Sequence, residues 1–224
     1  MRARFKYNLF DLDGTLTDPS LGITNSVIYA LERVGIEPPP REALYKYIGP
    51  PLVYSFRTYA GMDEETAVKA LTYYRERFSA GGMLENEIYP GIAALLADIR
   101  AGGGRVILAT GKPEDFAEKI LEHFDILRYF DFVAGNTLEE KRPEKRDVFR
   151  HIIANMPEIG QDGDNVVMVG DREYDILAAK EFSFRSAGVL FGFGSEEELR
   201  SAGADMIAAT VAELRGLLIE DGKS

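Results

Sequence analysis

The chain contains no cysteine and only two histidines among its 224 residues. The absence of cysteine excludes disulfides, thiolate metal sites and a cysteine nucleophile, and two histidines argue against a zinc site built from several of them. No apolar run reaches transmembrane length, and none long enough for a signal peptide precedes Asp11. We therefore expect a cytoplasmic protein.

Positive charge is also scarce, with 26 lysines and arginines against 37 aspartates and glutamates and a net charge of -11. This balance argues against nucleic acid or an anionic membrane surface as a partner. A small anionic substrate would need its own local cations. The hydrophobic fraction of 46% is that of an ordinary globular protein, and the length suits one large domain with an insert or two modest domains.

Short apolar runs alternate with helical patterns along most of the chain. Strands are predicted at 5–10, 105–110 and 165–169, with weaker candidates at 131–134 and 188–191. Such alternation predicts an α/β fold, a doubly wound parallel sheet with helices on both faces.

Residues 16–87 show no strand pattern. Apolar residues at helical spacing predict amphipathic helices around 23–34 and 67–78, and the second of these begins after a capping residue, Asp63. We therefore expect a core domain made of 1–15 and 88–224, with an α-helical insert at 16–87.

The most informative motif is Asp11-Leu12-Asp13-Gly14-Thr15, which directly follows the first apolar run. In extended backbone, residues two apart face the same side, so Asp11 and Asp13 would share one small volume. Two adjacent carboxylates repel each other unless a cation or a proton is present. The motif thus indicates a hard divalent metal, a carboxyl group kept protonated for acid chemistry, or both.

Three further polar clusters follow predicted strands: 110–112 (Thr-Gly-Lys), 141–145 (Lys-Arg-Pro-Glu-Lys) and 170–175 (Gly-Asp-Arg-Glu-Tyr-Asp). Ligands of open α/β sheets bind at the carboxyl ends of the strands. Four polar clusters brought to one edge therefore predict a functional site there.

The order and spacing of these motifs resemble those of the haloacid dehalogenase-like (HAD) phosphohydrolase superfamily. The shared elements are Asp-x-Asp-Gly-Thr-Leu-x-Asp, a strand ending in Thr, a lysine and Gly-Asp-x-x-x-Asp, and the similarity covers nearly the whole chain. Gly-Pro-Pro-Leu at 49–52, Gly-Lys-Pro at 111–113 and the glycine-rich 188–194 resemble the phosphoglycolate phosphatase-like branch. The resemblance implies a Rossmann-like HAD core with an inserted helical cap.

The same resemblance implies roles for the first two aspartates. Asp11 would be the nucleophile that forms an aspartyl-phosphate, and Asp13 would protonate the leaving oxygen and then deprotonate the attacking water. Mg²⁺ would be held by the carboxylate of Asp11, the backbone carbonyl of Asp13 and the carboxylate of Asp171. Asp175 would orient metal-bound water or the lysine, although capping of its own helix is an alternative.

Phosphate binding is assigned to Thr110 and to the amides of Gly111 and Lys112, which we expect to open onto a helix N-terminus. Thr110 could instead act as a helix cap. Lys145 is the expected catalytic cation, because Pro143 can begin a helix that carries Lys145 in its first turn. Lys141, four residues upstream, is the competing choice, and a solvated charged face is the alternative for the whole cluster.

These residues predict a phosphoric monoester hydrolase that depends on Mg²⁺ and acts on a small phosphate ester. Phosphoglycolate is the first candidate substrate and a nucleoside 5′-monophosphate the second. Two alternatives stay open: a phosphomutase similar to β-phosphoglucomutase, and a catalytically silent binding protein on the HAD fold. Intact Asp11, Asp13, Lys145 and Asp171 argue against the silent protein.

Overall fold

The computed structural model describes residues 1–222, and these residues form two compact units. Met1–Thr17 and the chain from Ile88 onward make the first, called the core unit here. Asp18–Glu87 make the second, called the helical unit. The insert expected at 16–87 starts two residues before the helical unit and ends at the same residue; that this unit is a cap domain stays a prediction. Every helix among the described residues is too short or too polar to span a bilayer.

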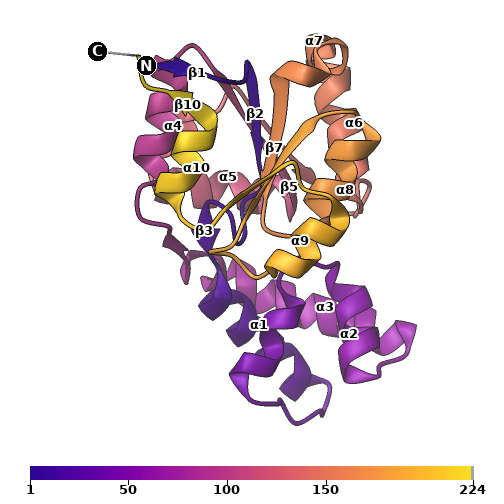
Figure 1. Ribbon diagram of the computed structural model, residues 1–224. Coiled ribbons are helices and arrows are strands. Elements are labelled where there is room, and N and C mark those ends of the chain that lie inside the picture. Colours follow the sequence, from indigo (N-terminus) through magenta and orange to yellow (C-terminus); the bar gives the residue numbers. More distant parts are fainter. Residues whose placement is uncertain (223–224) are drawn as a thin grey trace. The chain divides into compact units, whose positions relative to one another are not determined.

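A six-stranded parallel sheet organises the core unit, in the order β6-β5-β2-β7-β8-β9 (Figure 1). The remaining strands form a β1–β10 pair and a β3–β4 pair. The strands are β1 (Arg2–Ala3), β2 (Tyr7–Phe10), β3 (Thr17–Asp18), β4 (Glu87–Ile88), β5 (Arg105–Pro113), β6 (Phe132–Asn136), β7 (Val166–Gly170), β8 (Arg185–Val189), β9 (Met206–Ala208) and β10 (Ile219–Glu220).

The strand order places β2 at the centre of the sheet. Tyr7 is in register with Arg105 of β5 on one side and with Val166 of β7 on the other. The chain adds strands first on the β5 side and then on the β7 side of β2, so the winding direction reverses next to this strand. Open α/β sheets bind ligands at such a reversal, outside the carboxyl ends of the strands.

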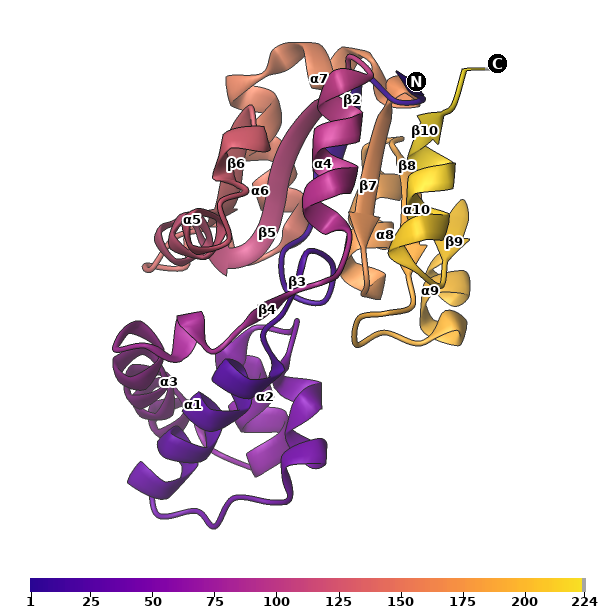
Figure 2. The same cartoon turned by 90° about the vertical axis from the view of Figure 1, so that its left-hand side faces the viewer.

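Helices cover both faces of the sheet. Figures 1 and 2 show α4 and α10 on one face and α6 and α8 on the other. In the core unit the helices are α4 (Ile92–Ala101), α5 (Glu114–His123), α6 (Lys145–Asn155), α7 (Pro157–Gln161), α8 (Glu173–Glu181), α9 (Glu196–Ala202) and α10 (Val211–Leu218). The predicted doubly wound α/β class is confirmed.

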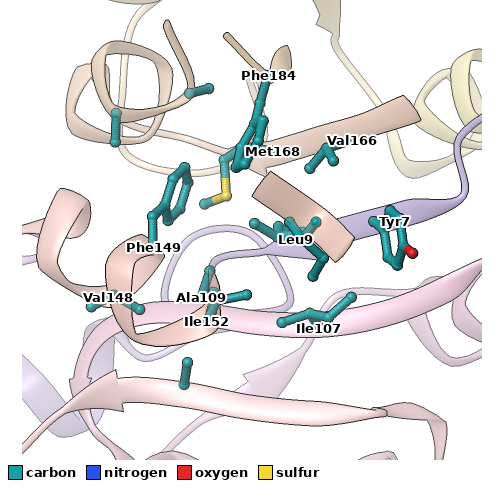
Figure 3. Close-up of a cluster of buried hydrophobic side chains, with 14 of the residues drawn as sticks. Tyr7, Leu9, Ile107, Ala109, Val148, Phe149, Ile152, Val166, Met168 and Phe184 are labelled. Carbon is teal, nitrogen blue, oxygen red and sulfur yellow. The ribbon is translucent and has the colours of Figure 1, made fainter. Parts of the chain in front are cut away.

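Apolar side chains from the central strands meet α6 in a buried cluster (Figure 3). Leu9 of β2 and Met168 of β7 are both completely buried there, with Phe149 of α6 packed over them. Strands with both faces covered need apolar residues at consecutive positions, which explains why the short runs of the sequence do not alternate with polar residues. This packing gives the carboxyl edge of the sheet a rigid support.

The helical unit contains α1 (Ser20–Arg33), α2 (Leu52–Ala60) and α3 (Glu64–Ser79). As predicted, the side chain of Asp63 caps α3 by accepting a hydrogen bond from the Thr66 amide at 2.8 Å. The sequence did not predict α2, because two prolines mark its entry as a loop. The backbone is extended at Pro51, and the helix starts at the next residue.

Candidate active site

The carboxyl edge of the sheet brings together the motifs that the sequence singled out. Asp11 directly follows β2, Thr110 lies in the last part of β5 and Asp171 directly follows β7. Lys145 is the first residue of α6. Because β2 lies between β5 and β7, three of these residues reach the same edge from neighbouring strands.

Lys145 is the cation at the centre of this group. Its Nζ lies 3.0 Å from Asp11 Oδ1 and 2.7 Å from Asp175 Oδ1, and it donates a hydrogen bond to the carbonyl of Ala109 at 2.8 Å. The competing Lys141 has an exposed side chain, with its nearest carboxylate that of Glu139 at 4.0 Å. The structure thus places Lys145 beside the aspartates and Lys141 at the surface.

The charges of Lys145, Asp11 and Asp175 stabilise one another by pairing. Burial opposes the positive charge of Lys145, but the carboxylates of Asp11 and Asp175 raise the pKa of its ammonium group above the ordinary value. Burial raises the pKa of Asp175 to about 6, with Lys145 opposing the rise and Asp11 adding to it. Lys145 therefore stays charged and partly offsets the repulsion between the two carboxylates.

Asp171 is held by close backbone on two sides. Gly14, at φ +78°, leaves room for its carboxylate, since a Cβ there would lie 2.2 Å from Asp171 Oδ2. A Cβ at Gly192 would lie 2.5 Å from the same oxygen, and the amide of Phe193 donates a hydrogen bond to it at 2.8 Å. The glycine after the second aspartate of the motif is therefore required by the approach of Asp171.

The residues present fit a divalent cation. Asp11, Asp171 and Asp175 each offer an oxygen, and these oxygens lie within 4.8 Å of one another. Asp171 Oδ1 is buried and has no hydrogen-bond partner among the described residues. Burial, and then the nearby Asp175 and Asp11, raise the pKa of Asp171 well above its ordinary value. A hard cation with oxygen ligands would satisfy the buried oxygen and remove the repulsion.

Asp175 is less available as a ligand than the other two. Its Oδ1 faces Lys145, and its Oδ2 accepts a hydrogen bond from the amide of Arg172 at 3.2 Å, at the start of α8. The carboxylate thus caps its helix and positions the lysine at the same time. The two roles that the sequence left open for Asp175, orienting the lysine and capping its own helix, are therefore compatible.

Asp13 has a different partner from Asp11. Lys112 Nζ lies 2.6 Å from Asp13 Oδ2 and 2.9 Å from Oδ1. Burial raises the pKa of the Asp13 carboxyl group above its ordinary value, and Lys112 opposes this rise. Burial thus makes the Asp13 carboxyl group easier to protonate than an exposed aspartate, which is the direction of shift that an acid catalyst needs.

The segment 110–112 differs from the expected helix N-terminus. Strand β5 runs to Pro113, and α5 begins only at Glu114. The amide of Lys112 donates to the hydroxyl of Thr110 at 3.2 Å, so this amide is engaged within the strand. Phosphate binding by Thr110, Gly111 and Lys112 stays a prediction.

Sequence reasoning missed two contacts of this site. It assigned Lys112 through its amide and not through its side chain, which contacts Asp13. It also gave no role to Phe193, whose amide contacts Asp171. The glycines at 192 and 194 were a usable signal, since a Cβ at either position would collide with Asp171.

Comparison with known proteins agrees with this geometry. Residues 8–189 match the family model described as haloacid dehalogenase-like hydrolase. The chain therefore belongs to the haloacid dehalogenase-like hydrolase family, and the predicted resemblance is confirmed.

Three relatives are similar over almost the whole chain. A 5′-nucleotidase of Pseudomonas aeruginosa is 41% identical, with 96% of each chain covered. Tyrosine-protein kinase PtkA of Mycobacterium tuberculosis is 36% identical over 94% of this chain and 71% of that protein. A phosphoglycolate phosphatase of Vibrio parahaemolyticus is 27% identical, with 92% of each chain covered.

The crystal structure of a predicted phosphatase from Clostridium acetobutylicum is also similar. It has a TM-score of 0.90 and 45% identity, and the match covers 95% of this chain and 97% of that chain. The predicted enzyme class, a phosphoric monoester hydrolase, agrees with these findings.

If these carboxylates bind a divalent cation, adding Mg²⁺ should change the thermal stability of the protein. This change can be measured without any substrate. Saturating Mg²⁺ should raise the Tm of the wild type by several degrees, because a ligand that binds only the folded state stabilises it. Asp171→Asn should lose most of this rise. Without metal the variant should be at least as stable as the wild type, because one of the crowded carboxylates is gone.

Thermal unfolding with and without Mg²⁺ measures both effects. Asp164→Asn is the matched control, since the side chain of Asp164 is 89% exposed and pairs only with Arg185 at 3.3 Å among the described contacts. An unchanged Mg²⁺ response in Asp171→Asn would contradict the assignment of Asp171 as a ligand.

Proposed function

We propose that the protein is a Mg²⁺-dependent phosphatase that hydrolyses a small phosphate monoester through an aspartyl-phosphate on Asp11. The observation that carries the proposal is the separate pairing of the two aspartates. Asp11 contacts Lys145 and lies near Asp171, whereas Asp13 contacts Lys112. In this proposal Asp11, beside Lys145 and the metal site, is the nucleophile, and Asp13, beside Lys112, transfers the proton.

In the first step, a carboxylate oxygen of Asp11 attacks phosphorus and the bond to the ester oxygen breaks. The Asp13 carboxyl group gives its proton to that oxygen, which leaves as an alcohol. In the second step, the Asp13 carboxylate takes a proton from water, and the water oxygen attacks phosphorus. The bond between phosphorus and Asp11 breaks, which frees inorganic phosphate and restores both aspartates.

The remaining residues support these steps. Lys145 would offset negative charge next to Asp11, and Asp175 would hold that lysine in place. Asp11, Asp171 and the backbone carbonyl of Asp13 would hold the metal. When bound, Mg²⁺ would neutralise charge on the phosphoryl oxygens and align them for in-line attack. We also propose that the helical unit is the cap that the family resemblance implies.

For the substrate we favour a nucleoside 5′-monophosphate over phosphoglycolate. Both fit a phosphatase for small metabolites, and the order rests on similarity: the 5′-nucleotidase is 41% identical to this chain and the phosphoglycolate phosphatase 27%. This reverses the order favoured by the sequence motifs alone. A phosphomutase would use the same nucleophile but return the phosphoryl group to a sugar.

A second candidate is phosphoryl transfer involving tyrosine, which the similarity to a tyrosine-protein kinase favours. The site of this chain contains an acid that can serve hydrolysis, Asp13, so we place this candidate after the phosphatase. Phosphotyrosine, and ATP together with a tyrosine peptide, belong in any substrate panel.

Asp11→Asn tests the proposed nucleophile. With Mg²⁺, the wild type should release inorganic phosphate from at least one metabolite monoester, with nucleoside 5′-monophosphates ahead of phosphoglycolate. The variant should lose roughly 10⁴-fold or more in kcat, because an amide oxygen is a poor nucleophile. Phosphate release over a metabolite panel is the measurement. No turnover of any ester, or an active Asp11→Asn protein, would contradict the proposal.

A pair of lysine variants tests the assigned cation. Lys145→Ala should lower kcat by roughly 10²–10³-fold, because it removes a buried positive charge from the reacting group. Lys141→Ala is the matched control from the same segment and should stay within about twofold of the wild type. Steady-state kinetics, with circular dichroism to confirm folding, compare them. A larger loss at Lys141 would refute the assignment.

A further inference from the structure

A second buried lysine lies beside the active-site aspartates and serves a different carboxylate from Lys145. Lys112 Nζ reaches both oxygens of Asp13, at 2.6 Å and 2.9 Å. The two side chains are 5% and 15% exposed. A surface ion pair contributes little to orientation, but one shielded from water to this degree fixes both partners.

The strand sets the direction of this lysine. Lys112 lies two residues beyond Thr110 in β5, in a stretch where the pairing with β6 shifts register between Ala109 and Pro113. Thr110 is 2% exposed, and its hydroxyl accepts the hydrogen bond from the amide of Lys112. Gly111, between them, is exposed. The end of β5 therefore brings the buried Lys112 side chain to Asp13, which lies 99 residues away in the chain.

The two lysines divide the aspartates between them. Lys145 pairs with Asp11 and Asp175, and Lys112 pairs with Asp13. The Asp13 carboxyl group thus makes its direct lysine contact with Lys112.

We propose that Lys112 is a positioning residue that holds the Asp13 carboxyl group in the orientation needed for proton transfer to the leaving oxygen. This inference rests on the proposed phosphatase function. An ammonium group has three donors and no acceptor. The hydroxyl of a protonated Asp13 therefore cannot donate to Lys112, and its proton is left for the ester oxygen while Lys112 keeps its contact with the carboxyl group. The same contact holds the carboxylate after the proton has left, ready to accept one from water.

This role predicts a dependence on the leaving group. An alkyl ester expels a poor leaving group and needs the proton of Asp13, whereas p-nitrophenolate leaves as a stable anion without it. Lys112→Met should therefore lower kcat for the best alkyl monoester by roughly 10–100-fold, and for p-nitrophenyl phosphate by less than about threefold. Lys112→Arg, which can also donate to both oxygens, should recover part of the loss.

Measuring kcat with the two esters, for the single and double variants, tests whether Lys112 acts through Asp13. In an Asp13→Asn background, Lys112→Met should have little further effect on the alkyl ester, since residues that act through one another are not additive. Lys119→Met, at an exposed position of α5, is the matched control and should behave like the wild type with both esters.

Two outcomes would overturn the positioning role. One is an equal loss with both esters, which indicates damage to the site as a whole. The other is a loss that adds fully to that of Asp13→Asn, with a raised KM, which indicates that Lys112 binds phosphate directly. A wild type that hydrolyses neither ester would contradict the proposed function itself, and this inference with it, so the two failures can be told apart.

Discussion

The structure depends on the crowding of four carboxylates at one edge of a parallel sheet. Asp11, Asp171 and Asp175 lie within reach of one ion, and Asp13 follows two residues after Asp11. Lys145 and Lys112 supply two positive charges to this group. With all four carboxylates ionised, two negative charges remain. A divalent cation matches that remainder, and a proton on Asp13 offsets part of it. The proposed nucleophile, acid and metal site would all follow from this one electrostatic constraint.

The topology explains how these groups reach one place. Parallel strands end at a common edge, and open α/β sheets bind ligands where the winding direction reverses, which here is beside β2. The strand order puts β5 and β7 on either side of β2, so their ends deliver Lys112 and Asp171 to Asp13 and Asp11. Close backbone completes the arrangement, because only glycine at 14 and 192 leaves room for Asp171.

Local sequence patterns were enough to predict part of the fold and of the candidate site. The apolar runs that became β2, β5 and β7 each end in polar residues, so Asp11, Thr110 and Asp171 could be placed at one edge from the sequence alone. Lys145 was predicted in the first turn of a helix begun by Pro143; it does lie in the first turn, but the helix begins at Lys145 itself, with Glu144 as the N-cap residue, so the proline does not start it. The ion pair between Lys112 and Asp13 was not predictable, because it joins residues 99 apart and depends on side-chain direction at the end of a strand. Helix α2 was not predicted because prolines precede it, and β9 was not predicted because it spans only three residues.

Trapping the covalent intermediate is the most direct test of the account. The protein would be mixed with a ³²P-labelled monoester and Mg²⁺, quenched in acid within the first turnover and digested, and the labelled peptide sequenced. The account predicts acid-stable label on the peptide that contains Asp11, and no label in Asp11→Asn. Label on another peptide, or full turnover with no labelled protein at any time, would contradict it.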